Sequence, residues 1–183
     1  MKVKLTDVRL SFPDLFTAVE FKTGDGKPRF NATFLVVPGS ENDKAIRAAI
    51  EHEANAAYGK KAAANLKAWE NNANKYAYLD GNLKEYDGYE GMMYLACHSK
   101  VRPSVFDRNP NVILTAQDGK PYAGCYVNAT VDIYAQQGEN PGIRAGFTGV
   151  QFSKDGDSFA GGTAAAPDEF ENLDDGSDAS DMV

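Results

Sequence analysis

The strictest pattern in the chain is an alternation of apolar and polar side chains over residues 125–135. The apolar positions are Cys125, Val127, Ala129, Val131 and Ile133, and they alternate with Tyr126, Asn128, Thr130 and Tyr134. Because successive side chains of a β-strand point to opposite faces, this period of two predicts a strand with one buried face. A single strand cannot cover its own core, so the fold must contain a sheet.

Other runs of β-type residues are expected to supply the partner strands. We predict strands at residues 3–12, 18–22, 29–37, 92–102, 112–115 and 142–153. The segment Ser11-Phe12-Pro13-Asp14 is a turn signal that ends the first run. Glycines and a proline within residues 23–28 predict a hairpin loop. The Tyr- and Gly-rich residues 75–91 predict irregular loops with at most a brief strand.

A helical region separates the early strands from the late ones. Apolar residues repeat at intervals of three and four at Ile46, Ala49, Ile50, Ala54 and Ala57, and again at Ala62, Leu66, Trp69 and Ala73. Ser40 is a typical N-cap for the first helix, and Gly59 is a plausible stop. The sequence therefore predicts two helices that pack on the sheet.

The predicted order is three strands, a helical region, and two or three further strands. This is the order of an open five-stranded barrel of the OB-fold kind, in which a helix follows the third strand. Any other α+β arrangement of the same elements also fits the pattern. We predict a mainly β fold with a helical insertion (α+β), forming an OB-fold-like domain over residues 1–160. A flexible, disordered acidic tail over residues 161–183 is expected to follow it.

The net charge of −7 is unevenly distributed along the chain. Seven acidic residues and no basic ones lie between residues 167 and 183, which leaves the rest of the chain with 19 of each sign. The body is therefore neutral, and the acidity does not exclude a nucleic-acid partner. The acidic residues expected to compete with such a partner include Asp174, Asp175, Asp178 and Asp181.

The sequence lacks the motifs that are typical of several functional classes. There is no phosphate-binding glycine loop of the P-loop or dinucleotide type and no Gly-x-Ser-x-Gly elbow. Cys97 and Cys125 lie in apolar runs, and His52 and His98 have no zinc-ligand spacing. We therefore expect no metal, no cofactor and no enzymatic activity. The absence of a secretory signal and of a long apolar run predicts a cytoplasmic protein with no membrane partner.

One enzymatic alternative stays open. The carboxylates Asp80, Glu85, Asp87 and Glu90 are close enough in sequence to suggest a metal-dependent nuclease. They lie in a polar loop, however, where solvated acids are the ordinary finding.

The outward faces of the predicted strands combine basic and aromatic residues. Proteins that bind single-stranded DNA use cations to follow the phosphates and flat rings on which bases stack. This combination predicts DNA contacts at Lys22, Arg29, Tyr94, Lys100, Arg102, Phe106, Arg108 and Tyr126. The alternative for each residue is a solvated charge or a tyrosine at the edge of the core. A structural or adaptor protein that binds another protein through the same sheet is the alternative for the chain as a whole.

Five segments resemble a bacteriophage family of single-stranded-DNA-binding proteins. They are residues 4–13 (KLTDVRLSFP), 99–103 (SKVRP), 124–129 (GCYVNA), 142–152 and the acidic C-terminus. The resemblance implies an OB-fold that covers single strands, without sequence preference, during phage DNA replication, recombination or repair. It also implies that the tail recruits replication or recombination proteins. The chain ends Asp181-Met182-Val183, without the terminal aromatic residue that many such tails use for docking.

Overall fold

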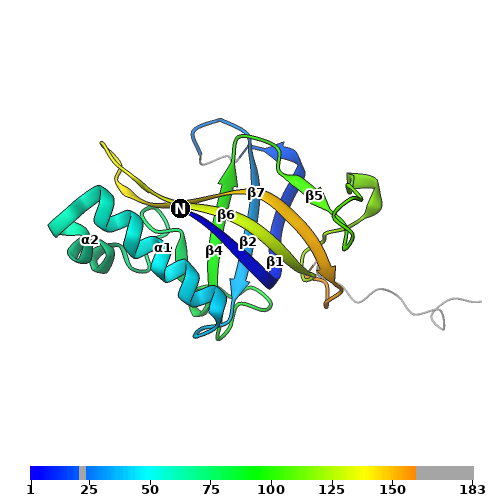
Figure 1. The fold of residues 1–183 in the computed structure, drawn as a ribbon, viewed down its shortest axis with the longest axis horizontal. Helices are drawn as coiled ribbons and strands as arrows, with labels where there is room; N and C mark the ends of the chain where they lie inside the picture. The colour runs from blue at the N-terminus through cyan, green and yellow to red at the C-terminus, as the bar shows by residue number, and fades with distance from the viewer. Residues whose placement is uncertain (21–23, 160–183) are drawn as a thin grey trace, which may run out of the picture.

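The computed structural model describes residues 1–20 and 24–159, and its strands form one seven-stranded sheet. The strands are β1 (Lys2–Val19), β2 (Arg29–Val36), β3 (Tyr78–Asp80), β4 (Met93–Ser99), β5 (Ser104–Phe106), β6 (Tyr126–Gln136) and β7 (Gly142–Lys154). Their order across the sheet is β3-β4-β2-β1-β6-β7-β5, so β3 and β5 are the edges and the sheet is open (Figure 1). The predicted mainly β fold with a helical insertion is confirmed. Lys22 and the predicted tail, including Asp174, Asp175, Asp178 and Asp181, lie outside the described residues.

β1 is a single long strand, and the prediction of two strands separated by a turn at residues 11–14 is wrong. The register between β1 and β2 shifts between Ser11 and Asp14, which is a β-bulge or a similar irregularity of the ladder. Phe12 takes a φ of 46° there, and 54% of the residue is exposed. A bulge bends a strand and redirects a side chain without ending the pairing, so turn-forming residues are compatible with a continuous strand.

The strand predicted at residues 112–115 is also wrong. The strand in this part of the chain is β5, which pairs in parallel with β7. Residues 112–114 run back alongside β5 without forming a strand. Leu114 N donates to Val105 O, and Ile113 forms an isolated bridge with Phe106. Val112 and Ile113 are exposed, so this apolar run does not contribute a face to the core.

The helical insertion follows the prediction closely. α1 (Glu41–Tyr58) begins after Ser40, whose hydroxyl accepts a hydrogen bond from Asp43 N, and it ends at Gly59 with a φ of 54°. α2 (Ala62–Trp69) follows after one short turn and lies beside α1 at one end of the sheet (Figure 1). The apolar stripe of α1 packs against β1 and β6. Among the described residues, neither helix is long and apolar enough to span a membrane.

The two faces of the sheet carry two separate apolar clusters. The main core contains Phe34 of β2, Leu95 of β4 and Phe147 of β7, together with the buried stripe of α1. The next residues along β2 and β4 point the other way, and Leu35 and Tyr94 form a second cluster there with Leu79 and Tyr89. The second cluster places aromatic rings on the outward face of β2 and β4.

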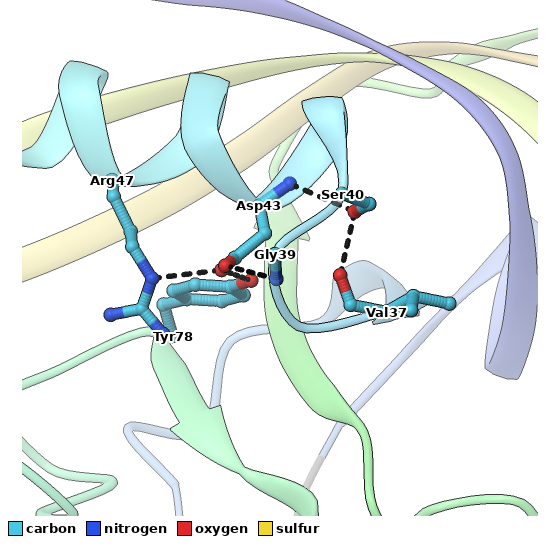
Figure 2. Close-up of polar contacts among 6 residues, drawn as sticks. All are labelled: Val37, Gly39, Ser40, Asp43, Arg47 and Tyr78. Atoms are coloured by element: carbon cyan, nitrogen blue, oxygen red, sulfur yellow. Dashed lines mark hydrogen bonds and ion pairs between the residues drawn. The ribbon is translucent and has the colours of Figure 1, made fainter.

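A buried carboxylate joins the start of α1 to β3 (Figure 2). Asp43 is 5% exposed and accepts hydrogen bonds from the Tyr78 hydroxyl (2.6 Å), Gly39 N (2.8 Å) and Arg47 Nε (2.9 Å). Burial by itself raises the pKa of Asp43, but these hydrogen bonds and the charge of Arg47 outweigh it and lower the pKa below its ordinary 3.8. The contact fixes β3, which leads directly into the loop that forms one wall of the candidate site.

Candidate nucleic-acid interface

A groove of about 1050 Å³ crosses the sheet beside the second apolar cluster. Its lining comes from β1, β2, β4, β6 and β7, and from residues 84–89 of the loop after β3. A second cavity of about 330 Å³ lies beside Arg47, Tyr78 and Asp80. The chemistry of the groove divides into an aromatic wall, a polar floor and a small number of charged groups.

The aromatic wall consists of Phe12, Tyr86, Tyr89 and Tyr94, in that order. Adjacent ring centroids lie 4.9, 5.3 and 5.3 Å apart, and the first two pairs meet edge to face. Tyr89 and Tyr94 are buried, whereas about half of Phe12 and of Tyr86 is exposed. The Tyr89 hydroxyl donates to Ser11 Oγ at 3.0 Å, and burial raises the pKa of Tyr89 and of Tyr94. Two fixed, neutral rings therefore support two exposed ones on which a flat ligand can stack.

The polar floor is a chain of hydrogen bonds across three strands. Asn31 of β2 donates through Nδ2 to Asp14 Oδ2 of β1 at 2.9 Å. Its Oδ1 lies 2.7 Å from His98 Nδ1 of β4. Partial desolvation, with the nearby charges of Arg29 and Arg144, lowers the pKa of His98 below its ordinary 6.5. The imidazole is therefore neutral at neutral pH.

Charges of both signs line the groove. The cations are Lys84 and Arg144, and the carboxylates are Asp14, Glu85 and Asp87. Arg144 is held by Asn74 O, to which its Nη1 donates at 2.7 Å, and by Gln136 Oε1 at 3.3 Å. The groove is thus not a uniformly basic trough, and most of its lining residues are uncharged.

The segment that follows β7 returns to the aromatic end of the groove. Phe159 lines the groove, and the Arg9 guanidinium lies 4.2 Å from the centroid of its ring. Arg9 also donates to Gly124 O at 2.9 Å and to Asp157 O at 2.8 Å. A Cβ on Gly88 would lie 2.5 Å from the Phe159 ring, so the loop after β3 needs a glycine there. The described part of the chain consequently ends against the second apolar cluster, which contains Tyr89 and Tyr94.

The whole chain, residues 1–183, matches the family described as Enterobacter phage Enc34, ssDNA-binding protein. The chain belongs to this phage single-stranded-DNA-binding family. The putative protein p50 of Acyrthosiphon pisum secondary endosymbiont phage 1 is 45% identical to it over 176 residues, which is 94% of each chain.

Solved structures share the fold. The Enc34 single-stranded DNA-binding protein in complex with ssDNA has a TM-score of 0.72 at 21% identity, covering 87% of this chain and 89% of that one. The single-stranded DNA-binding protein gp2.5 of bacteriophage T7 has a TM-score of 0.52 at 10% identity, covering 90% and 98%. The resemblance to phage single-stranded-DNA-binding proteins, drawn above from five segments, is confirmed.

Among the contacts predicted for this Enc34-family chain, Tyr94 lines the groove and Arg29 lies near His98. Tyr94 points away from the main core, as predicted, and it packs against Tyr89 with 6% of the residue exposed. Arg29 is half-buried and donates to Asp25 Oδ2 at 3.0 Å. The positive charge of Arg29 contributes to lowering the pKa of His98.

The other predicted contacts are distributed over the surface. Lys100 and Arg102 are exposed just beyond the end of β4, where the Arg102 guanidinium lies 5.8 Å from the Phe16 ring centroid. Phe106, which is half-buried, and Arg108, which is exposed, lie in and after β5. Tyr126 lies between the cations of Arg9 and Lys154, at 5.8 and 4.9 Å. None of these residues lines the groove, and their contacts with DNA stay predictions.

Sequence reasoning missed most residues of the groove, among them Phe12, Asp14, Asn31, Lys84, Tyr86, His98 and Arg144. A signal existed for two of them, because Asn31 and His98 fall on the outward faces of predicted strands. Phe12 was hidden inside a turn signal, and Tyr86 inside an irregular loop.

The carboxylates of the nuclease alternative do not form a metal site in the described part of the chain. Asp80 accepts a hydrogen bond from Asn82 N at 2.9 Å, which caps a short turn. Glu85 and Asp87 line the groove. Within the described residues, no three His, Cys, Asp or Glu side chains are grouped closely enough to hold a metal ion.

Proposed function

We propose that this chain binds single-stranded DNA along the groove, largely without sequence preference. Bound in this way, it covers exposed strands during phage DNA replication, recombination or repair in the host cytoplasm. Membership of the Enc34 family supports the proposal, as does the shared fold of a relative solved in complex with ssDNA. The observation that carries it is the exposed pair Phe12 and Tyr86, supported from behind by Tyr89 and Tyr94.

Stacking on this pair supplies affinity that tolerates any base. A base on an aromatic side chain contributes about 1–3 kcal/mol, because every base has a π-face. The two rings are 4.9 Å apart at an interplanar angle of 71°, so each presents a differently oriented face. Two successive bases therefore stack on different rings, and the strand bends as it passes the wall.

The phosphates follow cations at the rim of the groove and beyond it. Arg144 and Lys84 line the groove, and Arg29, Lys100 and Arg102 continue the positive charge toward the hairpin between β1 and β2. Neutralising about four phosphates gives a slope of about −3 for log affinity against log salt, using about 0.7 per phosphate on single strands. Lys22, Arg108, Phe106 and Tyr126 are retained as outlying contacts for a longer strand.

The acidic C-terminus competes with DNA for the same surface. Seven carboxylates lie between residues 168 and 181, and the described chain ends at the aromatic end of the groove, at Phe159. This position gives the tail a high effective concentration near the site. Truncation after Ala166 is expected to tighten DNA binding at low salt. An unchanged affinity would instead favour a tail that recruits replication or recombination proteins.

The direct test is fluorescence anisotropy with a labelled oligo-dT and a matched duplex at two salt concentrations. The proposal predicts binding of oligo-dT that weakens with salt and much weaker binding of the duplex. Salt-independent binding, or equal affinity for the duplex, would overturn it. Absence of binding to either would favour the structural or adaptor alternative, and cleavage of the oligonucleotide on adding Mg²⁺ would favour the nuclease.

A further inference from the structure

The orientation of the Asn31 amide on the groove floor is fixed by its partners. Its Nδ2 donates one hydrogen to Asp14 Oδ2 at 2.9 Å and the other to Arg29 O at 3.1 Å. Asn31 is 5% exposed, so a rotated amide would place its oxygen against a carboxylate and a carbonyl, with no water to separate them. Asn31 Oδ1 must therefore face His98 and act as an acceptor.

The state of His98 follows from this orientation. An acceptor at 2.7 Å from Nδ1 requires that Nδ1 carries the proton and donates. A neutral imidazole has one N–H only, so the unprotonated nitrogen is Nε2. The pKa of His98 lies below 6.5, which keeps this tautomer neutral at neutral pH. Nε2 thus offers a lone pair.

The carboxylate at the other end of the chain is only partly satisfied. Asn31 donates a hydrogen bond to Oδ2 of Asp14, and within the described residues no donor forms a hydrogen bond with Oδ1. Asp14, Asn31 and His98 all line the groove. The hydrogen-bonding capacity left on the floor therefore consists of acceptors: one carboxylate oxygen and one imidazole nitrogen.

Such a floor selects which part of a DNA strand lies on it. Asp14 repels phosphates at its end of the floor, whereas the cations Arg29 and Arg144 act on His98 at the other end, and Lys84 also lines the groove. Base edges differ in what they present: cytosine carries an N4 amino group where thymine and uracil carry the O4 acceptor. The amino group of cytosine offers two N–H donors. The N3–H of uracil lies between two carbonyl oxygens, and these would repel the acceptors of the floor.

We propose that the Asp14–Asn31–His98 chain is a base-reading subsite that accepts hydrogen bonds from the exocyclic amino group of an unpaired base. This proposal rests on the proposed binding of single-stranded DNA in the groove and adds one position of base preference to it. Asp14 is the residue that determines the preference, and Asn31 is a positioning residue that holds Asp14 and His98 in place.

The first experiment compares oligo-dC with oligo-dU of equal length by fluorescence anisotropy at pH 7.5. The two bases differ at position 4 and in the proton on N3, and neither carries the thymine methyl group. The wild-type chain is expected to bind oligo-dC about three- to tenfold more tightly, the range for one net hydrogen bond. Equal affinities would overturn the subsite and leave the proposed function intact, whereas no binding to either would count against the proposed function itself.

The second experiment changes the floor without removing it. In Asp14→Asn the amide oxygen still accepts from Asn31, and the amide nitrogen now presents a donor to the groove. The preference is expected to disappear or invert toward oligo-dU. The control is Asp87→Asn, which removes the same charge from the groove wall and is expected to strengthen binding to both oligonucleotides equally. An oligo-dC preference that persists unchanged in Asp14→Asn would overturn the assignment of Asp14.

Discussion

Asp43 and Asp14 each accept hydrogen bonds from side chains of neighbouring elements, and they differ in what they leave unpaired. Asp43 is buried, and its two oxygens accept three hydrogen bonds, from Tyr78, Gly39 and Arg47 (Figure 2). Asp14 is half-buried, and Asn31 takes only one of its oxygens. The comparison shows that a saturated polar network stabilises the fold, whereas an unsaturated one on a groove retains the capacity to bind a ligand.

Removing the saturated carboxylate is expected to have the largest effect. Asp43→Ala leaves the Tyr78 hydroxyl and Gly39 N–H buried without an acceptor, and should lower the free energy of unfolding by about 2–4 kcal/mol. Urea denaturation measures this. Asp14→Asn is the matched comparison, and its loss should stay below about 1 kcal/mol because Asn31 keeps an acceptor. Similar losses in both variants would contradict the distinction between the two networks.

Removing the exposed rings should affect binding more than stability. Phe12→Ala combined with Tyr86→Ala removes two stacking surfaces, each contributing about 1–3 kcal/mol, so the affinity for oligo-dT should fall at least tenfold. Anisotropy titration at fixed salt measures the change. Leu83→Ala is the control, because Leu83 is comparably exposed in the same loop but does not line the groove. Equal affinities in the double variant and the control would place the DNA elsewhere.

Charge removal outside the groove should change the salt dependence. Lys100→Ala with Arg102→Ala removes two candidate phosphate contacts and should reduce the slope of log affinity against log salt by about 1.4. The loss should be the same for oligo-dC and oligo-dU, because phosphates carry no base identity. Titrations at four salt concentrations measure the slope. An unchanged slope would exclude both side chains from the DNA path.

Acid should lower the contribution of the two networks to the free energy of unfolding, and it should do so in different pH ranges. The loss caused by His98 is expected to be the smallest of the predicted effects. The folded-state pKa of His98 is lowered, so its contribution is complete above the ordinary value of 6.5 and is lost as the pH falls below it. The pKa of Asp43 is also lowered, so its contribution is lost only below about 3.8. Urea denaturation at pH 7.5 and 5.5 should show a small loss in the wild type that is absent in His98→Gln. A loss of the same size in both proteins would assign it to other groups.

Local signals in the sequence predicted the elements well. The alternation over residues 125–135 corresponds to β6, and Ser40 and Gly59 mark the two ends of α1. These predictions succeed because capping, positive φ and strand periodicity are determined by residues close in sequence. The outward direction of Tyr94 was predictable for the same reason.

The groove was not predictable because it depends on tertiary context. Residues 11–14 have a turn composition, and only the pairing of β1 with β2 makes them a bulge that exposes Phe12. Tyr86 comes from a loop whose position depends on the contact of β3 with α1. His98 and Asn31 are 67 residues apart, and only the β2–β4 register brings them together.

The two edges of the sheet are its shortest strands. β3 and β5 each contain three residues, while the five strands between them contain 7 to 18. An exposed edge strand presents unpaired backbone groups with which another chain can form hydrogen bonds, and a short edge strand presents few of them. Copies of this chain at high local concentration should therefore have little tendency to aggregate edge to edge.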